Sequence, residues 1–178
     1  MNTNTKILVS ILLVGLGIAG RLMPHYWNFT PMIAIALFCA AYMGPKYSLS
    51  VPLIAMVLSD IFIGFYNPAV MISVYASIAI GGLIGSLLKN RVRILPIAGI
   101  SLLSSILFYL VTNAAVWAFS GMYPATGSGL IASYVAAIPF FKNMIVGDLW
   151  YSFMFFGAYE GARYVARYVK NVGLVEVR

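Results

Sequence analysis

Long runs of apolar residues constrain this chain more than any other feature. A helix that spans a membrane needs roughly 20 mostly apolar residues. Six segments approach this length: they run near Ile7–Met23, Pro31–Met43, Leu49–Gly64, Ala69–Leu88, Ile94–Phe119 and Asn143–Val165. Because lipid cannot satisfy exposed backbone groups, and because most of these runs exceed the length of barrel strands, we predict a bundle of transmembrane helices.

The composition leaves few other classes open. Of 178 residues, 62% are apolar and 8% are charged, whereas soluble domains carry about 25% charged residues. The single cysteine, Cys39, cannot form an internal disulfide. The net charge of +7 is spread too thinly to form a nucleic-acid patch. We therefore predict an all-α integral membrane domain over residues 1–178, with a short cytoplasmic tail at 166–178 and no nucleic-acid partner.

The basic residues predict how the bundle is oriented. With six spans and both termini inside, nine of the 11 Lys and Arg residues lie on the inner side: Lys6, Lys46, Lys89, Arg91, Arg93, Arg163, Arg167, Lys170 and Arg178. Arg21 and Lys142 lie outside. This bias is typical of a multi-pass protein of an inner (cytoplasmic) membrane, with the bilayer as a partner. A further apolar stretch, Gly129–Phe141, contains Pro139 and is interrupted by Ser133 and Tyr134. We expect it to be an interfacial or re-entrant piece, separate from the last span.

Small residues recur at a spacing of four in the first segment. Gly15 and Ala19 form one such pair. Small residues at this spacing let helix backbones approach closely. They can serve internal packing, or they can form a docking face for a partner membrane protein, and the sequence leaves both interpretations open.

Two acidic residues lie inside predicted spans, where ionisable groups are costly and mark functional sites. Asp60 precedes the outer end of the third span at Gly64, and Asp148 follows the outer start of the sixth. At 1.5 Å per residue, both lie roughly 6–9 Å below the outer boundary. Asn113 lies at a similar depth, and Arg21 ends the first span on the same side.

Aromatic and hydrogen-bonding residues fill the outer loops, so an outward-facing ligand pocket is predicted. The candidate substrate-binding residues are Arg21, Asn28, Asp60, Asn113, Trp117, Tyr123, Asn143 and Asp148. Arg21 is expected to clamp an anion or act as a counter-ion, the two aspartates to orient the ligand or Arg21, and Trp117 and Tyr123 to stack on it. The alternative is that these groups form ion pairs, belts and helix contacts of purely structural value.

Familiar catalytic and metal-binding patterns are missing. His25 and Cys39 have no neighbouring ligands at zinc spacing. The chain has no phosphate-binding loop and no G-x-S-x-G nucleophile motif. We therefore predict no cofactor, no metal and no catalytic residue. An intramembrane enzyme that uses Asp60 and Asp148 as a carboxyl pair remains an alternative, as does a structural or assembly protein.

Several motifs resemble an uncharacterised bacterial family of six-helix membrane proteins. They are Arg21-Leu-Met-Pro-His25-x-x-Asn-Phe-Thr-Pro31, Leu58-Ser-Asp60, Thr112-Asn113-x-x-Val-Trp117, Met122-Tyr-Pro124, Tyr134-Val-Ala-Ala-Ile-Pro-Phe-Phe141-x-Asn143 and Gly147-Asp148. That family is similar to the substrate-binding S components of energy-coupling-factor vitamin transporters.

The resemblance implies a function. S components bind vitamins or related micronutrients from outside and dock on a shared membrane subunit through small residues of the first helix, here Gly15 and Ala19, while a coupled ATPase pair supplies energy. This chain has Gly where an alanine motif is usual, and a solitary transporter is a further possibility. The expected function is therefore capture and uptake of a small, planar or partly anionic micronutrient, without an ATPase of its own.

Overall fold

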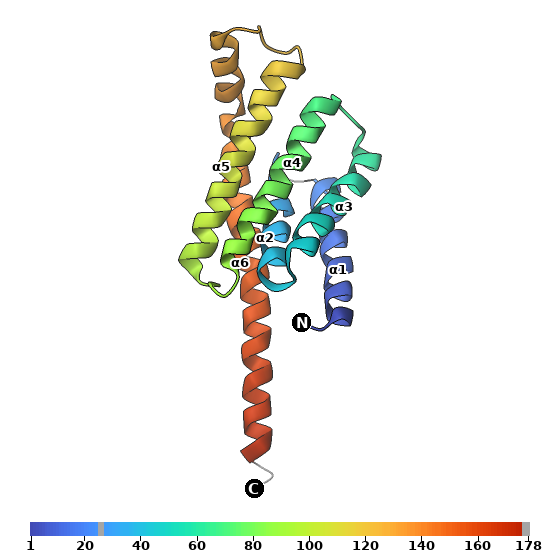
Figure 1. Cartoon of the computed structure of the whole chain (residues 1–178), viewed down its shortest axis with the longest axis vertical. Helices are drawn as coiled ribbons and strands as arrows, with labels where there is room; N and C mark the ends of the chain where they lie inside the picture. Colours follow the sequence, from blue (N-terminus) through green and yellow to red (C-terminus); the bar gives the residue numbers. More distant parts are fainter. Residues whose placement is uncertain (25–26, 176–178) are drawn as a thin grey trace.

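The computed structural model describes residues 1–24 and 27–175. Helices account for most of this part, and no strand occurs in it: α1 Thr3–Leu22, α2 Met32–Tyr42, α3 Pro45–Ile63, α4 Pro68–Ile84, the 3₁₀ helix η1 Gly85–Leu88, α5 Ile94–Phe119 and α6 Gly127–Val175. They pack as one elongated bundle (Figure 1). The predicted all-α fold class is confirmed.

Among the described residues, five helical segments are long and apolar enough to cross a membrane: α1, α3, α5, α6, and α4 continued through η1 to Leu88. Their outward surfaces carry large apolar side chains, among them Ile11, Phe62 and Leu95, the last 82% exposed. In water such a surface would be unstable, whereas lipid tails cover it without cost. Length and composition therefore fit a multi-pass membrane protein.

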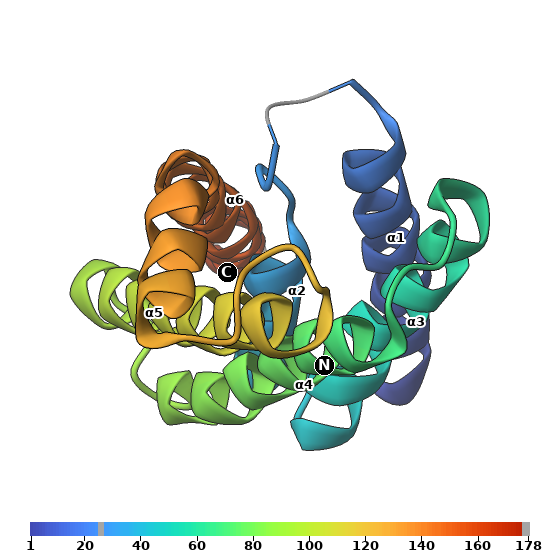
Figure 2. The same cartoon turned by 90° about the horizontal axis from the view of Figure 1, so that it is seen from above.

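Helix α2 occupies the centre of the bundle (Figure 2). Its 11 residues extend about 16 Å at 1.5 Å per residue, too short to cross a hydrocarbon core of about 30 Å. It contacts every other helix, and most of its residues are fully buried. Because protein rather than lipid surrounds α2, its non-helical approach through Trp27–Pro31 is tolerated. The predicted span over Pro31–Met43 is thus a short buried helix.

The chain reversals gather at two ends of the bundle. The N-terminus and the α2–α3 and α4–α5 connections lie at one end, and the other three connections lie toward the opposite end (Figure 1). Lys6, Lys46 and the basic α4–α5 connection therefore lie at one end, and Arg21 at the other. The charge asymmetry expected from the sequence is present in the arrangement of the helices.

The predicted break in the last segment is wrong, because α6 runs without interruption for 49 residues and includes Pro139. The polar residues that seemed to interrupt the stretch Gly129–Phe141 bond to the backbone of α5. Tyr134 donates to the Leu110 carbonyl at 2.8 Å, and Ser133 donates to the Asn113 carbonyl at 2.9 Å. These side chains attach α6 to its neighbour rather than ending it.

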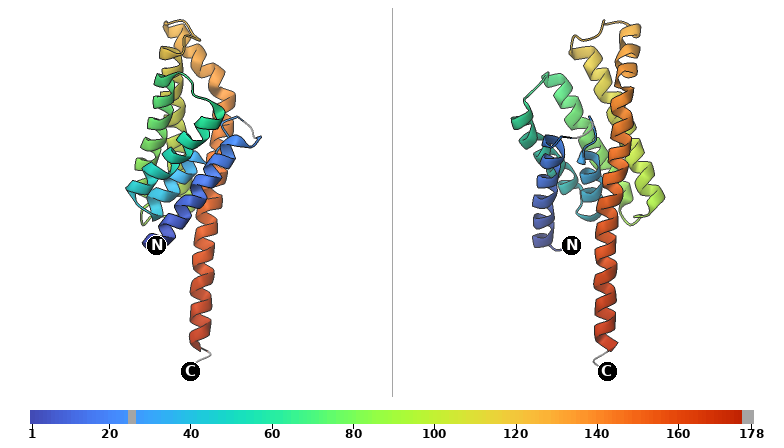
Figure 3. Two further views of the ribbon diagram at one scale, coloured as in Figure 1. Left: turned by 90° about the vertical axis from the view of Figure 1, so that its right-hand side faces the viewer. Right: turned by 180° about the vertical axis from the view of Figure 1, so that it is seen from behind.

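At its C-terminal end, α6 projects well beyond the other helices (Figure 3). Residues 161–171 of this projection are exposed. The residues predicted as a tail, 166–178, thus continue α6 as far as Val175, and residues 176–178 lie outside the described part.

Candidate ligand-binding site

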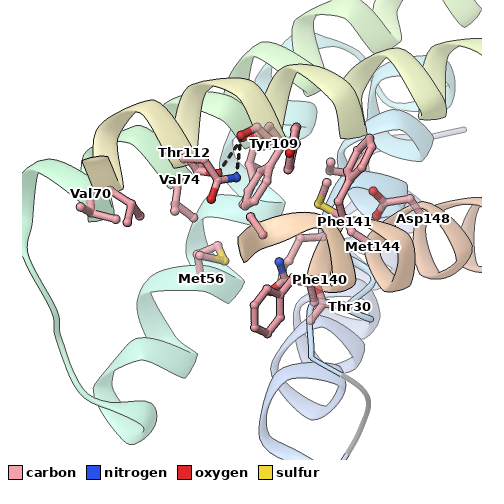
Figure 4. A pocket seen from close by; sticks show the side chains of 18 of the residues that line it. Thr30, Met56, Val70, Val74, Tyr109, Thr112, Phe140, Phe141, Met144 and Asp148 are labelled. Carbon is pink, nitrogen blue, oxygen red and sulfur yellow. Dashed lines mark hydrogen bonds between the residues drawn. The ribbon is translucent and has the colours of Figure 1, made fainter. Parts of the chain in front are cut away.

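A cavity of about 400 Å³ lies between the helices, beside the α1–α2 and α3–α4 connections. Its wall combines residues from every α-helix and from two connections (Figure 4). The lining residues are Arg21, Asn28, Thr30, Met32, Ile33, Met56, Tyr66, Val70, Val74, Ile78, Phe108, Tyr109, Thr112, Asn113, Val116, Ala137, Phe140, Phe141, Met144 and Asp148. We call this space the central cavity. Its volume and its mixture of many apolar and few polar groups are typical of small-molecule sites.

Arg21 closes the α1 side of the central cavity and is held from α3. Its guanidinium donates to the Met56 carbonyl at 3.1 Å and to the Ser59 hydroxyl at 2.5 Å. A second nitrogen lies 2.6 Å from a carboxylate oxygen of Asp60. Three acceptors therefore surround the guanidinium, whose side chain is 14% exposed.

Asp60 is fully buried behind Arg21 and does not line the cavity. Its second carboxylate oxygen accepts a hydrogen bond from the Tyr75 hydroxyl of α4 at 2.5 Å. Both oxygens thus have strong partners, and the pair links α1, α3 and α4. We call Arg21, Ser59, Asp60 and Tyr75 the Arg21 network.

Tyr66 lies in the α3–α4 connection and borders the central cavity. Burial raises the pKa of its phenol above the ordinary value, and the negative charge of Asp60 adds to this. Like an ordinary phenol, the Tyr66 hydroxyl keeps its proton at neutral pH, and it can donate a hydrogen bond at the edge of the cavity.

Asp148 enters the cavity wall from α6 with a different environment. It is 2% exposed, and one carboxylate oxygen accepts a hydrogen bond from the Ser105 hydroxyl of α5 at 2.7 Å. Within residues 1–24 and 27–175, no cation pairs with it. Its carboxyl group points from α6 toward the side where Phe141 and Met144 lie (Figure 4).

The segment that connects α1 to α2 covers one side of α6. Trp27 stacks on Phe140, with ring centroids 5.2 Å apart and an interplanar angle of 13°. Phe29 packs against Gly147, where a Cβ atom would come within 3.1 Å of its ring. Asn28 adopts a positive φ of 62°, which Asn tolerates better than most residues. This segment therefore depends on a small residue directly before Asp148.

On the α5 side, aromatic residues and amides form the wall. Tyr109 and Phe141 stack with centroids 4.4 Å apart. The Asn113 amide donates to the Tyr109 carbonyl at 2.8 Å, and the Tyr109 hydroxyl donates to the Tyr134 carbonyl at 2.7 Å. These bonds fix the rings between α5 and α6.

The structure brings together only some of the residues that were predicted to share a site. Arg21, Asn28, Asn113 and Asp148 line the central cavity, and Asp60 lies directly behind Arg21. The remaining three candidates do not line it: they are Trp117, Tyr123 and Asn143. The Trp117 indole donates to the Pro124 carbonyl at 3.0 Å, within the α5–α6 connection, so its polar atom is already engaged.

Sequence reasoning missed most of the apolar wall. Phe108, Phe140, Phe141, Met56 and Met144 line the cavity, yet none stands out in the sequence from neighbouring lipid-facing residues. The spacing of Phe108, Thr112 and Val116, each four apart, is a signal that places them on one helix face.

Gly15, one of the two residues of the predicted docking face, has different surroundings from Gly17 on the same helix. A Cβ atom at Gly15 would meet nothing within 4 Å, whereas one at Gly17 would clash with Ala55. Gly17 therefore serves internal packing, and Gly15 is exposed.

Cys39 is buried in α2, and His25 lies outside the described residues. Among the residues described, no group of three or more His, Cys, Asp or Glu side chains could hold a metal ion.

The chain belongs to a family of unknown function, DUF6580, whose model matches residues 1–170. No curated protein and no solved structure matches the chain.

Proposed function

We propose that the protein captures a small, vitamin-like micronutrient in the central cavity and takes part in its uptake. The observation that carries this proposal is the cavity itself: about 400 Å³, lined from every α-helix and bordered by the loops of one end. A cavity assembled from so many separate segments is suited to hold a ligand on all sides.

The proposed orientation follows from charge. The end with the N-terminus carries most basic residues, so we place it in the cytoplasm of a bacterial cell, with the protein in the inner membrane. The C-terminal end of α6 then also lies inside, and the cavity lies beside the α1–α2 and α3–α4 connections of the outer end. This orientation suits capture of a nutrient before it enters the cell.

The proposal includes an external source of energy, because the sequence has no phosphate-binding loop. In the manner of S components, a membrane coupling subunit with ATPases would dock on α1. The outward face of α1 supports this assignment, because Gly15 is exposed and its Cβ position is open. Ala19 continues the same face one turn further along.

The surroundings of Asp60 and Asp148 fit a binding role better than a catalytic one. Arg21 and Tyr75 hold Asp60, while Ser105 holds Asp148. A pair that shares a proton needs its carboxyl groups in contact, and these two have separate partners.

Blocking the cavity tests the proposal. The protein is purified in mild detergent from its native membrane, and the small molecules that it releases on denaturation are identified by mass spectrometry. Ala137→Trp fills the cavity from α6, since Ala137 is buried in its wall. Val135→Trp adds the same side chain to α6 at an exposed position and is the matched control.

The proposal predicts a stoichiometric metabolite in the wild type and in Val135→Trp, and its loss in Ala137→Trp. Thermal unfolding confirms that both variants are folded. Release of lipid alone from all three proteins would contradict the proposal.

A further inference from the structure

The carboxyl groups at the central cavity outnumber its cations. Arg21 supplies one positive charge, and the carboxylate of Asp60 neutralises it at 2.6 Å. The carboxylate of Asp148 is left over, with a serine hydroxyl as its hydrogen-bond partner. Burying a carboxylate without a counter-ion is costly, so such a group keeps its proton until a cation lies beside it. A cationic ligand would supply that counter-ion.

The wall around Asp148 suits a positively charged organic group. Four aromatic residues of α5 and α6 and one of the α3–α4 connection line the same cavity: Phe108, Tyr109, Phe140, Phe141 and Tyr66. Aromatic faces attract ammonium groups through their quadrupole, most strongly where water is excluded. An aromatic wall with one buried carboxylate is therefore complementary to an organic cation.

We propose that the ligand of the central cavity is an organic cation, with a protonated amine or quaternary ammonium group bound by Asp148. This inference rests on the proposed function and names its substrate class. The sequence predicted that Arg21 clamps an anion or acts as a counter-ion, and its pair with Asp60 corresponds to the second of these roles. Clamping an anion suits Arg21 less well, because Asp60 already neutralises its charge and Met56 and Ser59 accept from its guanidinium.

A purely structural role for Asp148 gives a different pattern of effects. Its bond to Ser105 joins α5 to α6, and this bond could be its whole purpose. Ser105→Ala removes the bond and keeps the carboxylate, whereas Asp148→Asn removes the charge and keeps an acceptor of the same shape. The two variants therefore separate charge recognition from helix attachment.

Three probes that share an indole ring and differ in charge test the proposal. They are tryptamine, which is a cation, tryptophol, which is neutral, and indole-3-acetate, which is an anion. Their affinities for the wild type, Asp148→Asn and Ser105→Ala are measured by isothermal titration calorimetry in detergent. Each titration is repeated with Ala137→Trp to confirm that binding occurs in the central cavity.

We expect the wild type to bind tryptamine at least about tenfold more tightly than the other two probes. Asp148→Asn should abolish this preference, and Ser105→Ala should keep it. Equal or tighter binding of tryptophol or indole-3-acetate, an unchanged preference in Asp148→Asn, or binding of none of the three would overturn the assignment. Should Asp148→Asn fail to fold, the order of the three probes on the wild type decides alone.

The two proposals can fail separately. A neutral or anionic metabolite that co-purifies with the wild type and is lost in Ala137→Trp leaves the capture function standing and refutes the cation. Lipid alone in every preparation, with no probe bound, refutes both.

Discussion

Asp60 and Asp148 are both buried carboxyl groups in helices, yet their surroundings differ in kind. Asp60 has a guanidinium at 2.6 Å and a phenol at 2.5 Å, and it lies behind the cavity wall. Asp148 has one serine hydroxyl at 2.7 Å and forms part of the wall itself. The first carboxyl group has all its partners within the protein, and the second has room for one more.

This contrast shows how two residues that look equivalent in a sequence can serve different ends. A buried charge with a complete set of partners holds helices together, and removing it leaves its partner unpaired. A buried charge that faces a cavity costs stability while the cavity is empty and supplies affinity when a ligand arrives. Three substitutions test whether Asp60 and Asp148 divide in this way, and a fourth, Trp27→Ala, tests the segment that packs on α6 beside the cavity.

Asp60→Asn should have the largest effect on stability. It leaves the Arg21 guanidinium buried without its counter-ion, and breaking a buried pair costs about 3–5 kcal/mol. The measurement is reversible unfolding in mixed micelles. The combined change Arg21→Met with Asp60→Leu removes both charges and should recover much of the loss, whereas an effect of Asp60→Asn below about 1 kcal/mol would contradict the role assigned to the Arg21 network.

Tyr75→Phe should have the second-largest effect on stability. It removes the hydroxyl that donates to Asp60 at 2.5 Å, and hydrogen bonds to charged groups contribute about 1.5–3 kcal/mol. The same unfolding assay checks the value. In the Arg21→Met, Asp60→Leu background the effect of Tyr75→Phe should shrink; an equal loss in both backgrounds would show that Tyr75 acts through packing alone.

Trp27→Ala should have a smaller effect. Trp27 is 70% exposed, so the change removes mainly its stacking on Phe140, and aromatic pairs contribute about 0.5–1.5 kcal/mol beyond burial. Limited proteolysis of the α1–α2 segment should become faster, while overall unfolding changes little. Unchanged proteolysis would show that the segment stays in place without the stack.

Asp148→Asn should have the smallest effect on stability, below about 1 kcal/mol, because an amide of the same shape still accepts from Ser105 and no cation is left unpaired. Unfolding measured beside Asp60→Asn gives the comparison directly. A loss as large as that of Asp60→Asn would place Asp148 among the structural groups.

Much of the fold follows from the sequence, because lipid demands long apolar helices and the basic residues gather at one end. The all-α class, the long helices and the bounds Ile94–Phe119 were predictable. The central position of α2 was not, because its 11 apolar residues read the same whether protein or lipid surrounds them. The continuity of α6 was missed because Ser133 and Tyr134 look like helix breaks until their bonds to α5 are known.

Candidate site residues could be predicted where their type is rare in this apolar chain, and could not be predicted where their type is common. Charged and amide groups stand out in an apolar chain, so Arg21, Asn113 and Asp148 were found. Phe140 and Phe141 could not be separated from the many aromatic residues that face lipid. The pairing of Arg21 with Asp60 rather than Asp148 depends on how α1 packs against α3, which spacing along the chain does not specify.

Native mass spectrometry of the intact protein tests the central claim most directly, namely that Asp148 serves a ligand while Asp60 serves the fold. Wild type, Asp148→Asn and Ser105→Ala are released from detergent in the gas phase, and the mass bound to each is measured. The account predicts one small-molecule adduct on the wild type and on Ser105→Ala, and none on Asp148→Asn. The same adduct at wild-type occupancy on Asp148→Asn would contradict it.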